Sequence, residues 1–239
     1  MSQDSTQVQS EDEGNLEIDF KYEILPDDFL QYDLSFKIIV IGDSGVGKSC
    51  LTNRATTNLF EETYTATVGF EFLSFKVKIN DKVVKLQIWD TCGQELYRSL
   101  ISSFYRNASL AMMVYAIDNK ESFNHIETWL KEVKLQSNPD IKIFLIGNKS
   151  DLEENRQVEY ERAKKFTEEN GIHYFSETSA KVGINAKEVF VEAAKLLYGE
   201  HLKYKVRNIK KHDNDKDKVP IPIKVTKAKS NRKKGGCCG

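Results

Sequence analysis

The sequence has no run of eighteen consecutive apolar residues, so it predicts no helix that crosses a membrane. Its first residues lack both the basic region and the apolar region of a secretory signal peptide, and we expect none. Cysteine is scarce as well: four occur, and neither their spacing nor their context is that of a disulfide framework or a zinc site. Together these absences favour a reducing, cytosolic compartment.

Charge is unevenly distributed, although the formal net charge is only −1. Residues 1–35 hold ten acidic residues and one lysine, whereas residues 201–239 hold thirteen Lys or Arg and three Asp. Ends of this kind are usually solvated, and a basic tail often meets an anionic surface. We therefore expect an acidic, mostly disordered extension over 1–35, one globular domain over 36–204 and a basic, flexible tail over 205–239. Apolar residues recur between Leu16 and Leu30, so a short docked segment in the extension is the alternative.

Short apolar runs alternate with helical stretches through the central part of the chain. Buried parallel strands are expected at 36–42, 85–90, 110–118, 142–148 and 173–179. Apolar and polar residues alternate over 70–79, as in an edge strand with one solvent-exposed face. Helices are expected at about 48–58, 95–106, 121–137, 159–170 and 185–204. This order predicts an α/β fold with a six-stranded, mostly parallel sheet flanked by five helices.

The strongest local motif is GDSGVGKS at 42–49, between an apolar strand and a helix. It matches the P-loop of nucleoside triphosphatases, in which glycines allow backbone N–H groups to approach phosphates at a helix N-terminus. Lys48 can reach the β- and γ-phosphates and contribute to catalysis, and the Ser49 hydroxyl can ligate Mg²⁺. The motif predicts a P-loop NTPase whose phosphate-binding residues are Ser44, Gly45, Val46, Gly47, Lys48, Ser49 and Cys50.

A second motif selects the base. Asn148, Lys149 and Asp151 directly follow an expected strand. The Asp151 carboxylate can accept hydrogen bonds from guanine N1–H and N2–H₂, a donor pair that adenine lacks. Ser179, Ala180 and Lys181 follow the last expected strand, where the Ala180 backbone N–H would donate to guanine O6. Because these motifs come about a hundred residues after the P-loop, they favour a guanine nucleotide.

A third motif, DTCGQE at 90–95, lies at the end of a strand. Asp90 could hold Mg²⁺ through a water molecule. Gly93 lacks a Cβ atom, so its N–H can approach the γ-phosphate closely. Gln94 is then placed to orient the attacking water, which makes it the principal catalytic candidate.

The motifs GDSGVGKS, WDTCGQE, NKSD and ETSAK together resemble those of Ras-superfamily GTPases, and of the Rab branch in particular. TVGFEF at 67–72 is similar to the Rab effector region, and FYRNA at 104–108 to the segment after the second switch. The family usually has Ala where Cys92 stands, and Arg-Phe where Leu96-Tyr97 stand. The resemblance implies a small G-protein fold that binds Mg²⁺ with GTP or GDP and hydrolyses GTP.

The resemblance also assigns roles to single residues. It implies that Thr67 ligates Mg²⁺ in the GTP state, that Phe60 packs against guanine and that Tyr64 closes over the phosphates. It further implies an exposed aromatic triad that effectors contact, although packing in the core is the alternative reading of those side chains. The triad comprises Phe72, Trp89 and Phe104.

The C-terminus resembles the double-geranylgeranyl site of Rab proteins. Cys237 and Cys238 follow a glycine-rich, basic stretch, and Gly236 stands where a C-a-a-X box needs cysteine. Two lipid chains hold a protein to a membrane far more firmly than one. Nearby lysines and arginines would add attraction to anionic lipid.

The resemblance implies regulation of vesicle trafficking on the cytoplasmic face of an endomembrane (Golgi, endosome or secretory vesicle), with cycling through the cytosol. It implies an exchange factor, a GTPase-activating protein, Rab-type effectors, a prenylation escort and a GDP-dissociation inhibitor as partners. No nucleic-acid partner is expected. Two alternatives remain. One is a P-loop ATPase or kinase, which Asn148 and Asp151 oppose. The other is a scaffold that binds nucleotide without cycling, which the intact residues Lys48, Ser49, Thr67 and Gln94 oppose.

Overall fold

The computed structural model describes residues 20–26, 28–61, 69–91 and 104–216. The chain divides into two units, Met1–Gly199 and Glu200–Gly239. All the strands that the structure describes lie in the first unit. Among the described residues, no helix has both the length and the apolar character needed to cross a membrane.

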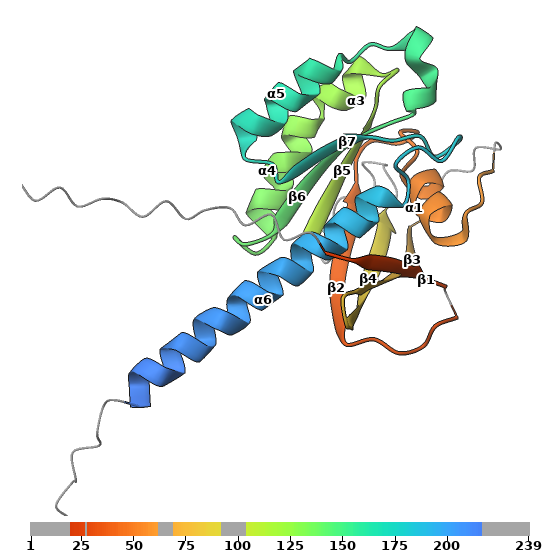
Figure 1. Ribbon diagram of the computed structural model, residues 1–239. Helices are drawn as coiled ribbons and strands as arrows, with labels where there is room; N and C mark the ends of the chain where they lie inside the picture. Colours follow the sequence, from red (N-terminus) through yellow and green to blue (C-terminus); the bar gives the residue numbers. More distant parts are fainter. Residues whose placement is uncertain (1–19, 27, 62–68, 92–103, 217–239) are drawn as a thin grey trace, which may run out of the picture. The chain divides into compact units, whose positions relative to one another are not determined.

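The sheet of the first unit has seven strands in the order β1-β3-β4-β2-β5-β6-β7 (Figure 1). The pairs β1/β3 and β3/β4 are antiparallel, and all other neighbours are parallel. The α/β prediction is confirmed, but the predicted count of six strands is wrong. The strands are β1 (Tyr22–Leu25), β2 (Leu34–Ile41), β3 (Phe70–Ile79), β4 (Lys82–Thr91), β5 (Leu110–Ala116), β6 (Lys142–Asn148) and β7 (Tyr174–Glu177).

Among the described helices, one expected helix is divided and another continues beyond its expected end, and the rest agree closely with the expected ranges. The expected helix at 121–137 divides at His125. Asn119 caps the first part, because its side chain accepts a hydrogen bond from the Ser122 N–H. The expected helix at 95–106 lies mostly outside the described residues. The helices are α1 (Lys48–Thr57), α3 (Lys120–Asn124), α4 (Ile126–Gln136), α5 (Tyr160–Asn170) and α6 (Glu188–Lys216), with a 3₁₀ helix, η2 (Ser150–Asn155).

Helix α6 continues to Lys216, beyond the expected boundary at residue 204. No glycine or proline occurs between Glu200 and Lys216. Lys and Glu favour helix, and the breakers Pro220 and Pro222 come later. The first part of the basic tail is therefore helical rather than a flexible linker.

The two faces of the sheet bury different side chains. Alternate residues of β2 and β5 point to opposite faces. Ile39, Ile41 and Met113 pack in one core cluster with Trp129 and Val133 of α4. On the other face, Phe75 of β3 contacts Phe190 of α6 with ring centroids 5.7 Å apart. Figure 1 shows α3, α4 and α5 gathered on one side of the sheet.

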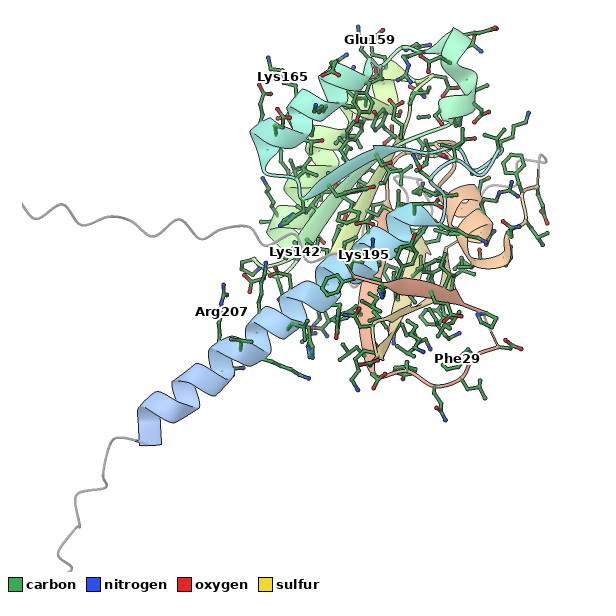
Figure 2. All side chains as sticks on the ribbon, viewed as in Figure 1. Phe29, Lys142, Glu159, Lys165, Lys195 and Arg207 are labelled. Atoms are coloured by element: carbon green, nitrogen blue, oxygen red, sulfur yellow. The ribbon has the colours of Figure 1, made fainter. Side chains whose placement is uncertain are left out.

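The seventh strand comes from the acidic extension. β1 pairs with the outer half of β3, from Lys76 to Ile79, so β3 is not the free edge strand that its alternating pattern predicted. Phe20 is buried against Tyr198 of α6, with ring centroids 5.4 Å apart. Lys195 of α6 lies beside β1 (Figure 2), and its Nζ is 4.6 Å from the ring centroid of Tyr22. The docked-segment alternative therefore holds for residues 20–25.

The extension also contacts the β3–β4 hairpin a second time, at the first residues of β4. The Asp33 N–H donates to Val83 O, and the Val83 N–H donates to Asp33 Oδ2, both at 2.8 Å. Lys82 Nζ pairs with Asp33 Oδ1 at 2.7 Å. Hydrogen bonding to Lys82 and Val83 lowers the pKa of Asp33. The segments before and after the loop that carries Phe29 (Figure 2), namely β1 and Asp33, therefore both contact the β3–β4 hairpin.

Phe20→Ala tests this docking. We expect it to lower the free energy of unfolding by about 3 kcal/mol, because truncating a buried Phe removes its apolar contacts and leaves a cavity. The measurement is urea denaturation at fixed nucleotide concentration. Leu30→Ala, at a side chain that is 87% exposed, is the matched control and should cost under about 0.5 kcal/mol. Equal losses from both variants would contradict a docked Phe20.

Candidate nucleotide-binding site

The predicted motifs meet at one edge of the sheet. The 42–49 loop follows β2, Asp90 lies near the end of β4, Asn148 ends β6, and the Ser179 loop follows β7. β2, β4, β6 and β7 run parallel, so their carboxyl ends share this edge. Ligands of open α/β sheets bind at such an edge.

The P-loop lies close to its neighbours at two glycines. A Cβ atom on Gly42, where φ is 140°, would lie 2.1 Å from Val114 O of β5. A Cβ atom on Gly47, where φ is 89°, would lie 2.4 Å from Asn148 Nδ2. Glycine is therefore required at both positions by backbone conformation and by space. Ser44 and Gly45, in the middle of the loop, are exposed.

Helix α1 begins at Lys48, near the end of the P-loop motif, and Gly47 provides no side-chain cap. Its first turn contains no acidic residue, so the positive end of the helix faces the loop without a compensating carboxylate of its own. Lys48 is buried, and its Nζ donates to Gly42 O at 3.0 Å and to Asp43 O at 2.8 Å. The loop thus has a buried cation and a helix N-terminus, both suited to phosphate.

Ser49 and Asp90, the two described residues that were predicted to hold Mg²⁺, lie in contact with each other. The Ser49 hydroxyl donates to Asp90 Oδ2, and Asp90 is fully buried. The other carboxylate oxygen, Oδ1, has no hydrogen-bond partner among the described residues. Burial raises the pKa of Asp90 to about 6, against the hydrogen bond from Ser49 and the charge of Lys48. A buried carboxylate with one unsatisfied oxygen beside a hydroxyl suits a hard divalent cation such as Mg²⁺.

Asp151 and Ser179, which come from the two motifs predicted to recognise the base, lie in contact with each other. Asp151 is exposed, and its Oδ1 accepts a hydrogen bond from the buried Ser179 hydroxyl at 2.5 Å. Lys149 adopts a left-handed backbone conformation with φ of 66°, and its Nζ lies 3.8 Å from Asp118 Oδ1. Lys181, at the end of the second motif, is exposed. The arrangement presents a carboxylate whose orientation is fixed by one neighbour.

Asn148 connects the phosphate loop to the base loop. Its buried amide Nδ2 donates to Val46 O at 2.9 Å and to Gly47 O at 3.3 Å. Its Oδ1 accepts from Thr178 Oγ1 at 3.1 Å and from the Ala180 N–H at 3.4 Å. The sequence predicted a nucleotide contact for Asn148, and this stays a prediction. The structure adds that its side chain links the two loops by hydrogen bonds. The Ala180 bond is long and therefore weak.

The expected aromatic surface differs in composition from the prediction. Phe72 is exposed, but Trp89 and Phe104 are half-buried against the core. Phe70, which the sequence reasoning missed, is 51% exposed and stacks on Trp89 with centroids 5.4 Å apart. Lys37 Nζ lies 4.8 Å from the Trp89 ring centroid. The two-residue spacing of Phe70 and Phe72 places both on one face of β3 and was the available signal.

Several predicted residues lie outside the part of the chain that the structure describes. These are Tyr64, Thr67, Cys92, Gly93, Gln94, Cys237 and Cys238. Of the others, Phe60 is half-buried just after α1. Cys50 lies in α1, and burial raises the pKa of its thiol. No group of three or more His, Cys, Asp or Glu side chains that could hold a metal occurs among residues 20–26, 28–61, 69–91 and 104–216.

A comparison with protein families agrees with this geometry. The model described as the Ras family matches residues 37–199, which is more than half of the chain. The matched range includes the P-loop, Asp90, Asn148 and Asp151 but begins after β1.

Proposed function

The chain belongs to the Ras family and is a small GTPase switch, and on that premise we propose that it is of Rab type and regulates vesicle trafficking. The observation that best supports a guanine-nucleotide cycle is the set of hydrogen bonds made by the Asn148 side chain. They link the phosphate loop to the loop after β7, where Ser179 contacts Asp151. A carboxylate at one end and a buried Lys48 at the other match guanine and phosphates respectively.

We propose that the reaction is transfer of the γ-phosphoryl group to water, giving GDP and phosphate. Lys48 and the first turn of α1 hold the phosphates, and Gln94 orients the water. Ser49, Asp90 and Thr67 would hold Mg²⁺, which when bound offsets charge on the phosphate oxygens. Catalysis of this kind is mostly positioning, so unaided turnover is slow and an activating protein is expected to supply an arginine.

The Rab assignment rests on the WDTCGQE and TVGFEF motifs and on the paired terminal cysteines. We propose that Rab-type effectors bind the surface that carries Phe72, Trp89 and Phe104. An exchange factor, a prenylation escort and a GDP-dissociation inhibitor complete the proposed cycle. Its proposed place is the cytoplasmic face of an endomembrane.

Two measurements test the proposed chemistry. Competition among GTP, ATP and GDP for the purified full chain decides the base, and a single-turnover phosphate-release assay decides hydrolysis. GTP and GDP should displace a fluorescent GDP analogue, whereas ATP should not. Preferential binding of ATP would favour the ATPase alternative. Tight GTP binding with no phosphate release, even with an activating protein, would favour a non-cycling scaffold.

We propose that geranylgeranyl groups on Cys237 and Cys238 anchor the protein. Replacing both by Ser should move the protein almost entirely from the membrane pellet to the supernatant, because each lipid contributes about 0.8 kcal/mol per buried CH₂. The measurement is sedimentation of membranes from cells that express the variant. Cys50→Ser, within α1, is the matched control and should leave sedimentation unchanged. Unchanged pelleting of the double variant would point to attachment through a protein partner.

A further inference from the structure

We propose that His125 and Trp129 are positioning residues for the phosphate loop, which they hold by its second residue, Asp43, and that they thereby slow nucleotide release. Trp129 Nε1 donates to Asp43 Oδ1 at 2.9 Å. His125 Nδ1 lies 2.6 Å from Asp43 Oδ2. Both carboxylate oxygens of Asp43 are therefore engaged by the α3–α4 junction, more than eighty positions away in the sequence.

The donors come from a rigid part of the molecule. Trp129 is 3% exposed and packs in the core cluster beneath α4. His125 lies at the junction itself, where its backbone N–H donates to Glu121 O at 3.0 Å. Its other ring nitrogen, Nε2, lies 3.5 Å from Glu121 Oε1. An ionised carboxylate only accepts hydrogen bonds, so Nδ1 of His125 is the donor to Asp43.

The contact bears directly on the geometry of the loop. Asp43 follows Gly42, whose backbone lies against Val114, and its own carbonyl accepts the bond from Lys48 Nζ. Fixing the Asp43 side chain from outside therefore orients the peptide group that Lys48 contacts inside. The far end of the loop is held by Asn148 through Val46 O. Hydrogen bonds therefore fix the loop at both ends, and those from His125 and Trp129 fix its start.

The alternative explanation is that these contacts with Asp43 contribute to folding stability alone. A buried indole N–H needs a partner, and Asp43 would serve even if the phosphate loop gained nothing from the contact. That explanation predicts a loss of folding stability with no specific effect on bound nucleotide. Positioning predicts faster nucleotide release in both variants. For His125→Ala it predicts nearly unchanged stability, because the Asp43 side chain is partly exposed and water can replace the lost donor. Trp129→Phe also removes core contacts and should lose some stability whichever explanation holds.

The test measures dissociation of a methylanthraniloyl-GDP complex of the full chain in Mg²⁺ and excess GDP. His125→Ala and Trp129→Phe should each raise the rate about five- to tenfold, since each removes one hydrogen bond to a charged group. His125→Asn, whose amide N–H can replace Nδ1–H, should restore a rate near that of wild type. In Asp43→Ala, adding His125→Ala should give no further increase, because the shared partner is gone.

Glu121→Gln is the matched control, because it changes only the contact of His125 that faces away from the loop, and its rate should stay near wild type. Urea midpoints of all variants are measured alongside. The positioning role would be overturned by wild-type release rates in His125→Ala and Trp129→Phe. It would also be overturned if the rates rose only in proportion to lost stability and His125→Asn did not restore them. The inference rests on the proposed guanine-nucleotide cycle, so a wild-type chain that bound no GDP would overturn both, whereas normal GDP binding with unaltered variants would overturn the inference alone.

Discussion

Asp151→Asn is expected to reverse the base preference of the protein, lowering affinity for GDP by about a hundredfold or more and creating affinity for xanthosine diphosphate. Two bonds to a charged acceptor are lost with guanine, each worth about 1.5 to 3 kcal/mol. The new amide N–H faces guanine N2–H₂, donor against donor, whereas xanthine presents an oxygen there. Competition titration with the two diphosphates measures the change.

Ser179→Ala is the matched control for this variant. Its hydroxyl donates to Asp151 Oδ1 at 2.5 Å, so its loss should loosen the carboxylate without changing its chemistry. Affinity for GDP should fall, but the preference for guanine over xanthine should remain. If Asp151→Asn keeps the wild-type guanine preference, Asp151 does not contact the base.

The strands that the sequence predicted correctly are those whose burial is visible locally. β5, the second half of β2 and the middle of β6 are continuous apolar runs because both of their faces are covered. β1 has only four residues, is mostly exposed and lies in an acidic segment. Its place in the sheet depends on pairing with Lys76–Ile79, about fifty residues away, and on Phe20 reaching Tyr198. No local pattern contains that information.

The site was predictable to the extent that its chemistry depends on short loops. Glycines that permit close approach, a lysine at a helix start and an aspartate at a strand end are recognisable one motif at a time. Contacts between motifs were not predictable. The Asn148 hydrogen bonds, the Thr178 bond and the contact of Trp129 with Asp43 join residues between thirty and about a hundred positions apart. Such partners are selected by the fold rather than by spacing.

Gln94→Leu is expected to lower the rate of GTP hydrolysis with an activating protein by about a thousandfold or more, because the side chain that orients the attacking water is lost. Nucleotide binding should be nearly unchanged, because Lys48, Ser49 and Asp151 keep their contacts. The measurement is single-turnover phosphate release with and without an activating protein, beside GDP affinity by titration.

The matched control is Gln87→Leu, the same substitution a few positions earlier in the sequence. Gln87 is half-buried in β4, and its Nε2 donates to Ser35 Oγ at 2.9 Å, away from the motifs at the sheet edge. This variant loses one neutral hydrogen bond and should hydrolyse GTP at the wild-type rate, both alone and when stimulated. The contrast separates loss of water positioning from a general effect of replacing glutamine by leucine in the segment that includes β4 and Gln94. Stimulated hydrolysis at the wild-type rate in Gln94→Leu would show that another residue orients the water, while equal losses in both variants would show that the effect comes from damage to β4.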